Sequence, residues 1–327
     1  MQRRLKDEQE AKRRAEDELR RKEEADRRAR LQAEEEKRRR EEAAREAERR
    51  AEAARTRKLE EERLAKQKDE AERKRQFDEQ LAAWERVKES TDLAAIEQFV
   101  YRYPSSQFTD LAQLRLDQLL ARQGEKRIEI VSAPENPYTK GTARADTAFK
   151  VGDTWSFRTV NRNKDGEVTT YRHVVTSITE SEVIINDGRV ILDLLGNILQ
   201  TSDGRRFTGG QDMALEYALG RHWKSRSIVT VGQNEGFFEA EYRVAARERI
   251  TVPAGTFDCF KVVMKGDGLM RPPKGPVQVS AEVTCWIAPA QVRRQVARET
   301  LRRVFPLRGT SFIAQWDRQE LTAYQQS

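Results

Sequence analysis

Large hydrophobic residues are rare in the first part of the chain, where alanine, glutamine, a few leucines and charged residues follow one another. These residue types favour a helix. Acidic residues repeatedly come four positions before basic ones, as in Glu16 and Arg20 or Glu46 and Arg50. Each such pair stabilises a helix by roughly 0.2 to 0.5 kcal/mol. We therefore predict one long charged helix over residues 1–89.

The few leucines of this helix determine whether it pairs with another helix. Leu5, Leu19, Leu31, Leu59 and Leu64 do not keep a heptad spacing, and the alanines between them would fill the holes of a coiled coil poorly. The pattern favours a single solvated helix that acts as a spacer. A weak coiled coil, which would make the protein a homodimer through this helix, is the second interpretation, and disorder is the third.

Apolar residues return at helical spacing over residues 90–123. The sequence STDLAAIEQFVYRYPSSQFTDLAQLRLDQLLARQ predicts two short helices that are separated at Tyr103 and Pro104. A single hairpin of this kind cannot form the groove of a peptide-binding repeat protein, so we expect a helical clasp. Residues 124–149 contain Gly124, Pro134 and Pro137 and are expected to form a linker.

From residue 150 to 327 the hydrophobic period changes to two. Alternating stretches such as TWSFRTV, FFEAEYRV and VQVSAEVTCWI are separated by turn residues, which indicates antiparallel strands. The predicted fold class is therefore a multidomain α+β protein, with a long charged helix, a short helical hairpin and an antiparallel β-sandwich or half-barrel.

Composition excludes several classes of function. The 62 basic and 55 acidic residues are interleaved, so the net charge of +7 does not form the one-sign stripe of a nucleic-acid-binding protein. Two cysteines and two histidines match no metal-ligand spacing, and we expect no metal and no cofactor. No stretch is apolar enough to span a membrane.

The start MQRRLKDEQE has no apolar segment behind it, so no signal peptide is recognisable. The sequence as written therefore predicts a cytoplasmic protein. A start that is truncated relative to the natural one would instead allow a periplasmic or envelope location.

The stretch VPAGTFDCFKV places Asp258 and Cys259 directly after a tight turn. Cys259 shares a strand face with Phe257, and cysteine is among the most often buried residues, so we expect a core thiol. A disulfide with Cys285 and a catalytic nucleophile are the alternatives. The nucleophile would need a nearby base, and neither histidine lies in a motif that provides one.

Five arginines are concentrated in one strand-like segment near residue 300: Arg293, Arg294, Arg298, Arg302 and Arg303. Arg294, Arg298 and Arg302 share one face by parity, and Trp286 could add an apolar wall. These four residues are our candidates for a surface that binds an anionic ligand, such as a lipid head group or a glycan, or a partner protein. The alternative is a solvated outer face of a strand.

Two resemblances are carried by short motifs. The first covers a run that resembles the segment after a charged helix in bacterial caspase-like proteins: Trp84, Ile96, Phe99, Tyr103, Pro104, Ser105, Ala112 and Leu116. The second is the pair VPAGTFDCFKV and WIAPAQVRR, which resembles exported bacterial β-rich domains of unknown function, with Ile287 where Tyr is usual. The chain has none of the His-Gly and Cys context of the caspase-like catalytic domain, so the resemblance implies its non-catalytic part.

Our leading hypothesis is a non-enzymatic scaffold or binding protein, in which a helical stalk presents a β-rich domain to a protein or envelope ligand. The alternative is an accessory or regulatory segment of a caspase-like peptidase system. A hydrolase that uses Asp258 or Cys259 is a weaker third hypothesis. A protein partner is expected, and nucleic acid is not.

Overall fold

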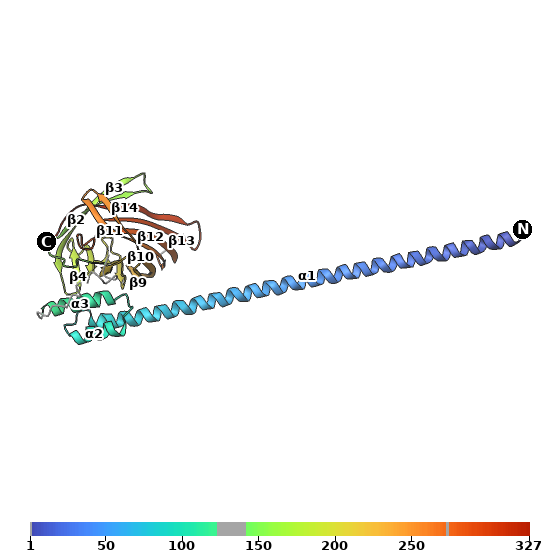
Figure 1. The fold of residues 1–327 in the computed structure, drawn as a ribbon, viewed down its shortest axis with the longest axis horizontal. Coiled ribbons are helices and arrows are strands. Elements are labelled where there is room, and N and C mark those ends of the chain that lie inside the picture. Colours follow the sequence, from blue (N-terminus) through green and yellow to red (C-terminus); the bar gives the residue numbers. More distant parts are fainter. Residues whose placement is uncertain (1, 123–141, 273–274) are drawn as a thin grey trace, which may run out of the picture. The chain divides into compact units, whose positions relative to one another are not determined.

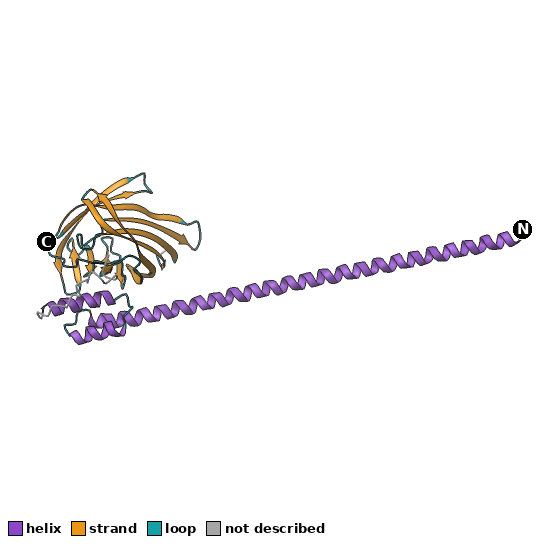
Figure 2. Ribbon diagram, viewed as in Figure 1, coloured by secondary structure: helices purple, strands orange, loops and turns teal. Residues whose placement is uncertain are grey.

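The computed structural model describes residues 2–122, 142–272 and 275–327, with side chains from residue 16 onward. The chain divides into two units, Met1–Arg75 and Gln76–Ser327. Figures 1 and 2 show a long helix in the first unit and curved strands with short helices in the second. We call residues 76–327 the head.

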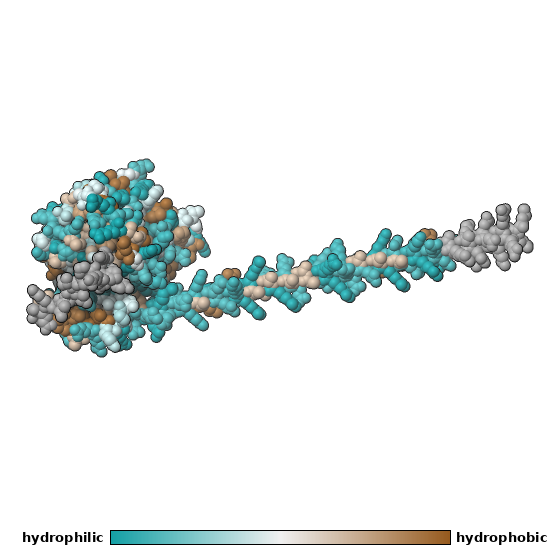
Figure 3. All heavy atoms as spheres, viewed as in Figure 1, coloured by the Kyte–Doolittle hydropathy of each residue, from teal (hydrophilic) through white to brown (hydrophobic). Residues whose placement is uncertain are grey.

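Helix α1 spans Gln2–Val87 and crosses from the first unit into the head. Its charged side chains form ion pairs along the helix, such as Arg39 to Glu35 at 2.9 Å and Lys22 to Glu18 at 3.7 Å. Four leucines of the first unit are solvent-exposed, namely Leu19, Leu31, Leu59 and Leu64, with Leu59 at 67%. The described part of α1 is mostly hydrophilic in Figure 3, with a narrow stripe of weakly hydrophobic residues.

No described helix contains a stretch that is both long and apolar enough to cross a membrane.

The helices α2 (Leu93–Arg102) and α3 (Thr109–Arg122) pack against the last turns of α1. Asp92 caps α2, because its carboxylate accepts a hydrogen bond from the Ala94 backbone N–H at 3.0 Å. The core of this clasp is aromatic: Phe77 and Trp84 of α1 contact Phe108, with ring centroids 6.2 and 6.3 Å apart. The clasp is thus held by buried rings.

The head contains fourteen described strands: β1 (Ala143–Arg144), β2 (Thr154–Asn161), β3 (Glu167–Ile178), β4 (Glu182–Ile185), β5 (Val190–Asp193), β6 (Ile198–Gln200), β7 (Arg206–Thr208), β8 (Glu216–Tyr217), β9 (His222–Val231), β10 (Asn234–Val252), β11 (Gly255–Met270), β12 (Val277–Ile287), β13 (Ala297–Pro306) and β14 (Phe312–Gln325). Strands β1 and β8 form a separate antiparallel pair.

The other twelve strands form a closed barrel in the order β10-β11-β12-β13-β14-β2-β3-β4-β5-β6-β7-β9, and β9 pairs with β10 to complete the ring. Every pairing in the barrel is antiparallel. The prediction of a β-sandwich or half-barrel is therefore wrong. A sandwich has two sheets with separate edges, whereas each strand of this ring pairs on both sides.

The ring closes through a weak seam at β6 and β7. Strand β6 pairs with β7 through the single residue pair Gln200 and Arg206, and β7 pairs with β9 at three positions. Beyond this point Gln107 takes the place of a strand: its amide oxygen accepts from the Arg226 N–H, and its amide nitrogen donates to the Arg226 carbonyl, both at 2.9 Å. The clasp thus covers the seam and satisfies backbone groups that β7 is too short to reach.

Candidate functional site

The barrel encloses a cavity of about 650 Å³. Asn234 at the start of β10 and Arg271 after β11 line one end of it, whereas Asn197 and Arg294 lie at the other. Cavities of this size hold small organic ligands in other proteins. The described residues of the cavity differ sharply in chemistry from one side of the ring to the other.

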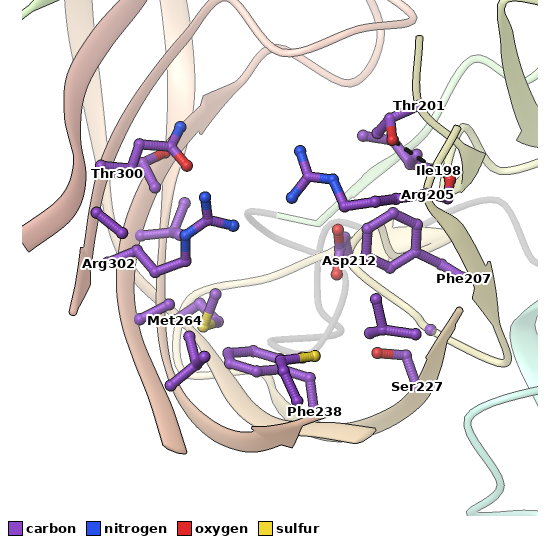
Figure 4. A pocket seen from close by; sticks show the side chains of 18 of the residues that line it. Ile198, Thr201, Arg205, Phe207, Asp212, Ser227, Phe238, Met264, Thr300 and Arg302 are labelled. Atoms are coloured by element: carbon purple, nitrogen blue, oxygen red, sulfur yellow. Dashed lines mark hydrogen bonds between the residues drawn. The ribbon is translucent and has the colours of Figure 1, made fainter. Parts of the chain in front are cut away.

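One side of the cavity is polar and positively charged. On β13 the inward residues alternate with outward ones, so Arg298, Thr300 and Arg302 face the cavity. Arg294 lies in the turn before this strand. Arg205, in the turn before β7, faces the cavity from the other side and forms an ion pair with Asp203 at 2.9 Å. In Figure 4, Arg302 and Arg205 point into the cavity from opposite sides.

The part of the wall that is formed by β10 to β12 is mostly apolar. Its members include Phe238 and Met264, which lie next to each other in Figure 4, together with Val279 and Val283 of β12. Gly266 on β11 creates room for one of these rings, because a Cβ there would lie 2.7 Å from the Phe238 ring. The cavity therefore has one aliphatic wall and one cationic wall.

Several polar atoms of this cavity lack a hydrogen-bond partner. In the described part of the chain, buried side-chain nitrogens without a partner occur in four residues, and three of these residues line the cavity: His173, Arg294 and Arg298. Arg294 is only 3% exposed, and its one hydrogen bond runs from Nη1 to the Gly196 carbonyl at 2.8 Å. Buried polar groups are usually satisfied, so this concentration needs an explanation.

The cavity-facing arginines of β13 also form no ion pair within the described chain. Neither Arg298 nor Arg302 forms a hydrogen bond or an ion pair with residues 16–122, 142–272 or 275–327. Five arginines line the cavity, against the carboxylates of Asp212, Glu235 and Asp317. Asp212 accepts a hydrogen bond from the Tyr242 hydroxyl, and its charge is among the causes that raise the pKa of Arg298 against the effect of burial. The cavity therefore carries an excess of positive charge.

Burial and mutual repulsion shift the titration of these groups. Burial lowers the pKa of Arg294 to about 10 and of His173 to about 3, and the Arg294 charge adds to the shift of His173. Burial raises the pKa of Tyr171 to about 12, although both Arg294 and Arg298 oppose that shift. At neutral pH the histidine and the tyrosine are uncharged, while the arginines keep their charge.

Asn197 and Asp193 form a buried hydrogen-bonded cluster at the inner end of the cavity. Asn197 donates from Nδ2 to Asp193 at 2.7 Å, and its Oδ1 accepts from the Asp212 and Met213 N–H groups at 2.8 and 2.6 Å. Burial raises the pKa of Asp193 to about 6, against hydrogen bonds from Asn197, Leu195 and Gly196 that lower it. These bonds fix the end of the cavity.

The structure separates the four residues that the sequence grouped together. Arg294, Arg298 and Arg302 line the cavity, whereas Trp286 is not among its described lining residues. The Trp286 Nε1 donates to Glu248 at 2.5 Å, and the Arg318 guanidinium lies 5.3 Å from its ring centroid. The sequence analysis did not identify Tyr171 and His173 of β3 as site residues, because no local motif marks them. The only available signal was their alternation with polar neighbours along the strand.

Asp258 and Cys259 point in opposite directions from β11. The Asp258 carboxylate accepts a hydrogen bond from Arg247 Nη2 at 2.6 Å at the surface. Cys259 is fully buried, and burial raises its thiol pKa to about 12, with Asp258 adding to the shift. Both cysteines are free thiols, so the disulfide alternative is wrong. A thiol with a raised pKa is protonated at neutral pH and is a poor nucleophile.

Within the described ranges, no group of three or more His, Cys, Asp or Glu side chains could hold a metal ion. The aspartates near turns have other roles: Asp203 accepts from the Thr201 hydroxyl at 2.6 Å, and Asp193 and Asp212 belong to the hydrogen bonds of the cavity.

No protein-family model matches the chain, and no curated protein sequence matches it. Three solved structures are similar to it. A protein from Bacteroides fragilis, described as exported and as having a YmcC-like fold, is 14% identical; the match covers 56% of this chain and 100% of that protein, with a TM-score of 0.29. A lipoprotein from Parabacteroides distasonis is also 14% identical, with coverage of 54% and 96% and a TM-score of 0.27.

The third structure is the hypothetical lipoprotein YmcC from Escherichia coli, which is 11% identical, with coverage of 52% and 83% and a TM-score of 0.30. The three are described as exported proteins or lipoproteins, as the motif resemblance to exported β-rich domains implies, and none is described as caspase-like. At these TM-scores the likeness supports no argument about function. The accessory role in a caspase-like peptidase system stays a prediction.

Proposed function

We propose that this chain is a non-enzymatic binding protein of the bacterial envelope, and that its barrel binds a small anionic ligand against Arg294 and Arg298. One observation carries the proposal: the buried Arg294 and the partly buried Arg298 of one cavity each have a buried Nε atom without a partner. All of the described residues that line this cavity belong to the head. In this proposal α1 serves as a spacer.

The energetic argument concerns charge as well as hydrogen bonding. Water can fill a polar cavity and accept hydrogen bonds from a guanidinium. It does not compensate the charge, and a buried cation without an anion is costly. A carboxylate or phosphate group would supply both an acceptor and the opposite charge, in the geometry that guanidinium groups favour. We therefore expect the ligand to carry such a group.

Binding of simple anions to the full chain tests this proposal. The probes are inorganic phosphate and butyrate, and the measurements are isothermal titration calorimetry and the NMR signals of the arginine Nε–H groups. We expect both anions to bind weakly and to shift the Nε–H signals of Arg294 and Arg298.

The Arg298→Gln variant should lose this binding. Its matched control is Arg303→Gln, which changes the same residue type on the same strand at a residue that pairs with Glu282 outside the cavity, at 3.3 Å. Equal anion binding by the two variants, or none by the unmodified protein, would contradict the proposal.

A further inference from the structure

We infer that the ligand is an amphiphile whose anionic group binds at Arg298 and Arg294 and whose alkyl chain lies along the aliphatic wall of β10 to β12. This inference rests on the proposed function and adds the class of ligand. It follows from the way in which the two walls are placed beside each other by the strand register.

The register between β12 and β13 sets each arginine beside a known neighbour. Arg298 pairs with Cys285 and Arg302 pairs with Ala281, while Val279 pairs with Val304 farther along β12. The inward residues of β12 from Val283 to Val277 therefore continue past both arginines toward the loop that follows β11. An anionic group at Arg298 leaves room for a chain that extends along these valines.

The wall itself suits a flexible chain. Val279 and Val283 present only methyl groups, and Met264 adds a thioether that adapts its shape to its neighbours. The Phe238 ring lies against the open positions of Gly266 and Gly268, where a Cβ would come within 2.9 Å of it. Two successive inward positions of β11 thus have no side chain, and the Phe238 ring packs into the space that they leave.

A free sugar fits this arrangement less well than an alkyl chain. Hydroxyl groups surround a sugar ring, and those that face a wall of valine and methionine would lose their hydrogen bonds to water without replacement. An alkyl chain has no such groups and gains free energy with each methylene that it buries. The chemistry shared by fatty acids and alkyl phosphates, one anionic group on an apolar chain, matches both walls.

Two homologous series of probes test the inference on the full chain. The first is butyrate, octanoate and dodecanoate, and the second is butyl, octyl and dodecyl phosphate, each kept below its micelle concentration. We expect the affinity to rise up to about fourfold per added methylene while the chain stays within the cavity. The two series distinguish a carboxylate from a phosphate head group. Octanol, which has the chain without the charge, should bind more weakly than octanoate.

Variants separate the two walls. Val279→Thr places a hydroxyl on the aliphatic wall with little change of volume, and it should reduce the gain from butyrate to dodecanoate. Val263→Thr is the matched control, because Val263 lies on β11 and is not among the described residues that line the cavity. Arg298→Gln should lower the affinity of every member of a series without changing the gain per methylene.

The outcomes distinguish the inference from the proposed function. If butyrate and phosphate bind but longer chains bind no better, the amphiphile is excluded and the anion site stands. If no anion of any length binds, both proposals fail. A gain with chain length that Val279→Thr and Val263→Thr reduce equally would also overturn the inference, since the chain would then not lie along this wall.

Discussion

Arginines on helix α1 and arginines at the barrel cavity lie in opposite environments. Arg39 is exposed to solvent and pairs with Glu35 one helical turn away at 2.9 Å. Arg298 is partly buried on a strand, and its Nε has no partner. Arg39 thus has a carboxylate partner on its own helix, whereas Arg294 and Arg298 of the cavity form no ion pair within the described chain. The difference suggests that the first set serves solubility and helix stability, and the second serves binding.

Arg293 and Arg294 are adjacent in the sequence and show the same contrast between a paired and an unpaired arginine. Arg293 is buried and fully engaged: it bonds to Asp153 at 2.5 Å, to Asp146 at 2.8 Å and to the Ser327 carbonyl at 2.9 Å. Arg294 has one hydrogen bond to a carbonyl and no ion pair within the described chain. A buried arginine is therefore not in itself a sign of a binding site, because its partners decide which role it has.

The largest effect is expected for Arg293→Ala. The change leaves the buried Asp153 carboxylate without its cation, and such a loss costs about 3 to 5 kcal/mol in the free energy of unfolding. Denaturant unfolding would measure it, with Arg303→Ala as the surface control, which should stay within about 0.5 kcal/mol. A cost below about 1 kcal/mol would remove the contrast between Arg293 and Arg294.

The next effect depends on pH and concerns Asp193, whose charge raises the pKa of Arg294. The Asp193 carboxyl has a pKa of about 6 in the folded protein, against an ordinary value of 3.8. Between these values only the folded state binds the proton, so the free energy of unfolding should fall as the pH rises from about 4 to about 6. The shift corresponds to about 3 kcal/mol.

Unfolding of Asp193→Asn at a series of pH values checks this sign. Asparagine does not titrate, so the variant should lose the downward slope that Asp193 contributes between pH 4 and 6, whatever its absolute stability. If the slope of the free energy of unfolding against pH is the same in the variant, Asp193 is charged throughout this range. It would then act as a counter-ion of Arg294.

A gain in stability is expected for Arg298→Met. The side chain keeps its approximate length but loses a partly buried charge that forms no ion pair within the described chain, so the free protein should become more stable by about 1 to 3 kcal/mol. The same variant should no longer be stabilised by octanoate. Arg303→Met at the surface should do neither. If Arg298→Met instead destabilises the free protein, Arg298 has a structural role and the comparison fails.

The sequence predicts the face that these arginines share, but not what that face encloses. Parity identifies residues on one side of a strand, and it applies equally to a solvated surface and to a barrel interior. Closure depends on β6 and β7, which have three residues each and are too short to show an alternating pattern. It also depends on Gln107, whose bonds to the Arg226 backbone join residues 119 positions apart. Such distant contacts leave no local signal.

The same limit explains why the sequence grouped Trp286 with the arginines and missed His173. Trp286 is close to the arginines in sequence, yet its side chain contacts Glu248 and Arg318 and not the cavity. His173 is far from them in sequence, yet it lines the same cavity, because β3 is separated from β13 by only β14 and β2 in the ring. Strand order decides such proximity, and the hydrophobic pattern of single strands does not contain it.

The smallest effect per residue is expected on α1, where each arginine can be deprived of its carboxylate partner by a Glu→Gln change. The triple change Glu35→Gln, Glu36→Gln and Glu46→Gln removes three pairs in which the acid comes four residues before the arginine. Each pair contributes roughly 0.2 to 0.5 kcal/mol, so circular dichroism of a fragment of residues 1–75 should show a modest loss of helicity that salt reproduces in the unmodified fragment.

Dilution of the same fragment separates a single helix from a coiled coil. A helix stabilised by its own ion pairs keeps its helicity at all concentrations, and Leu59→Ala should leave that helicity unchanged or slightly higher, because alanine is the better helix former. A coiled coil loses helicity on dilution and when a leucine of its seam is shortened. Sedimentation at the highest concentration gives the mass. A dimer mass with concentration-dependent helicity would mean that part of α1 is stabilised by a partner after all, and that the contrast with the cavity arginines is one of degree.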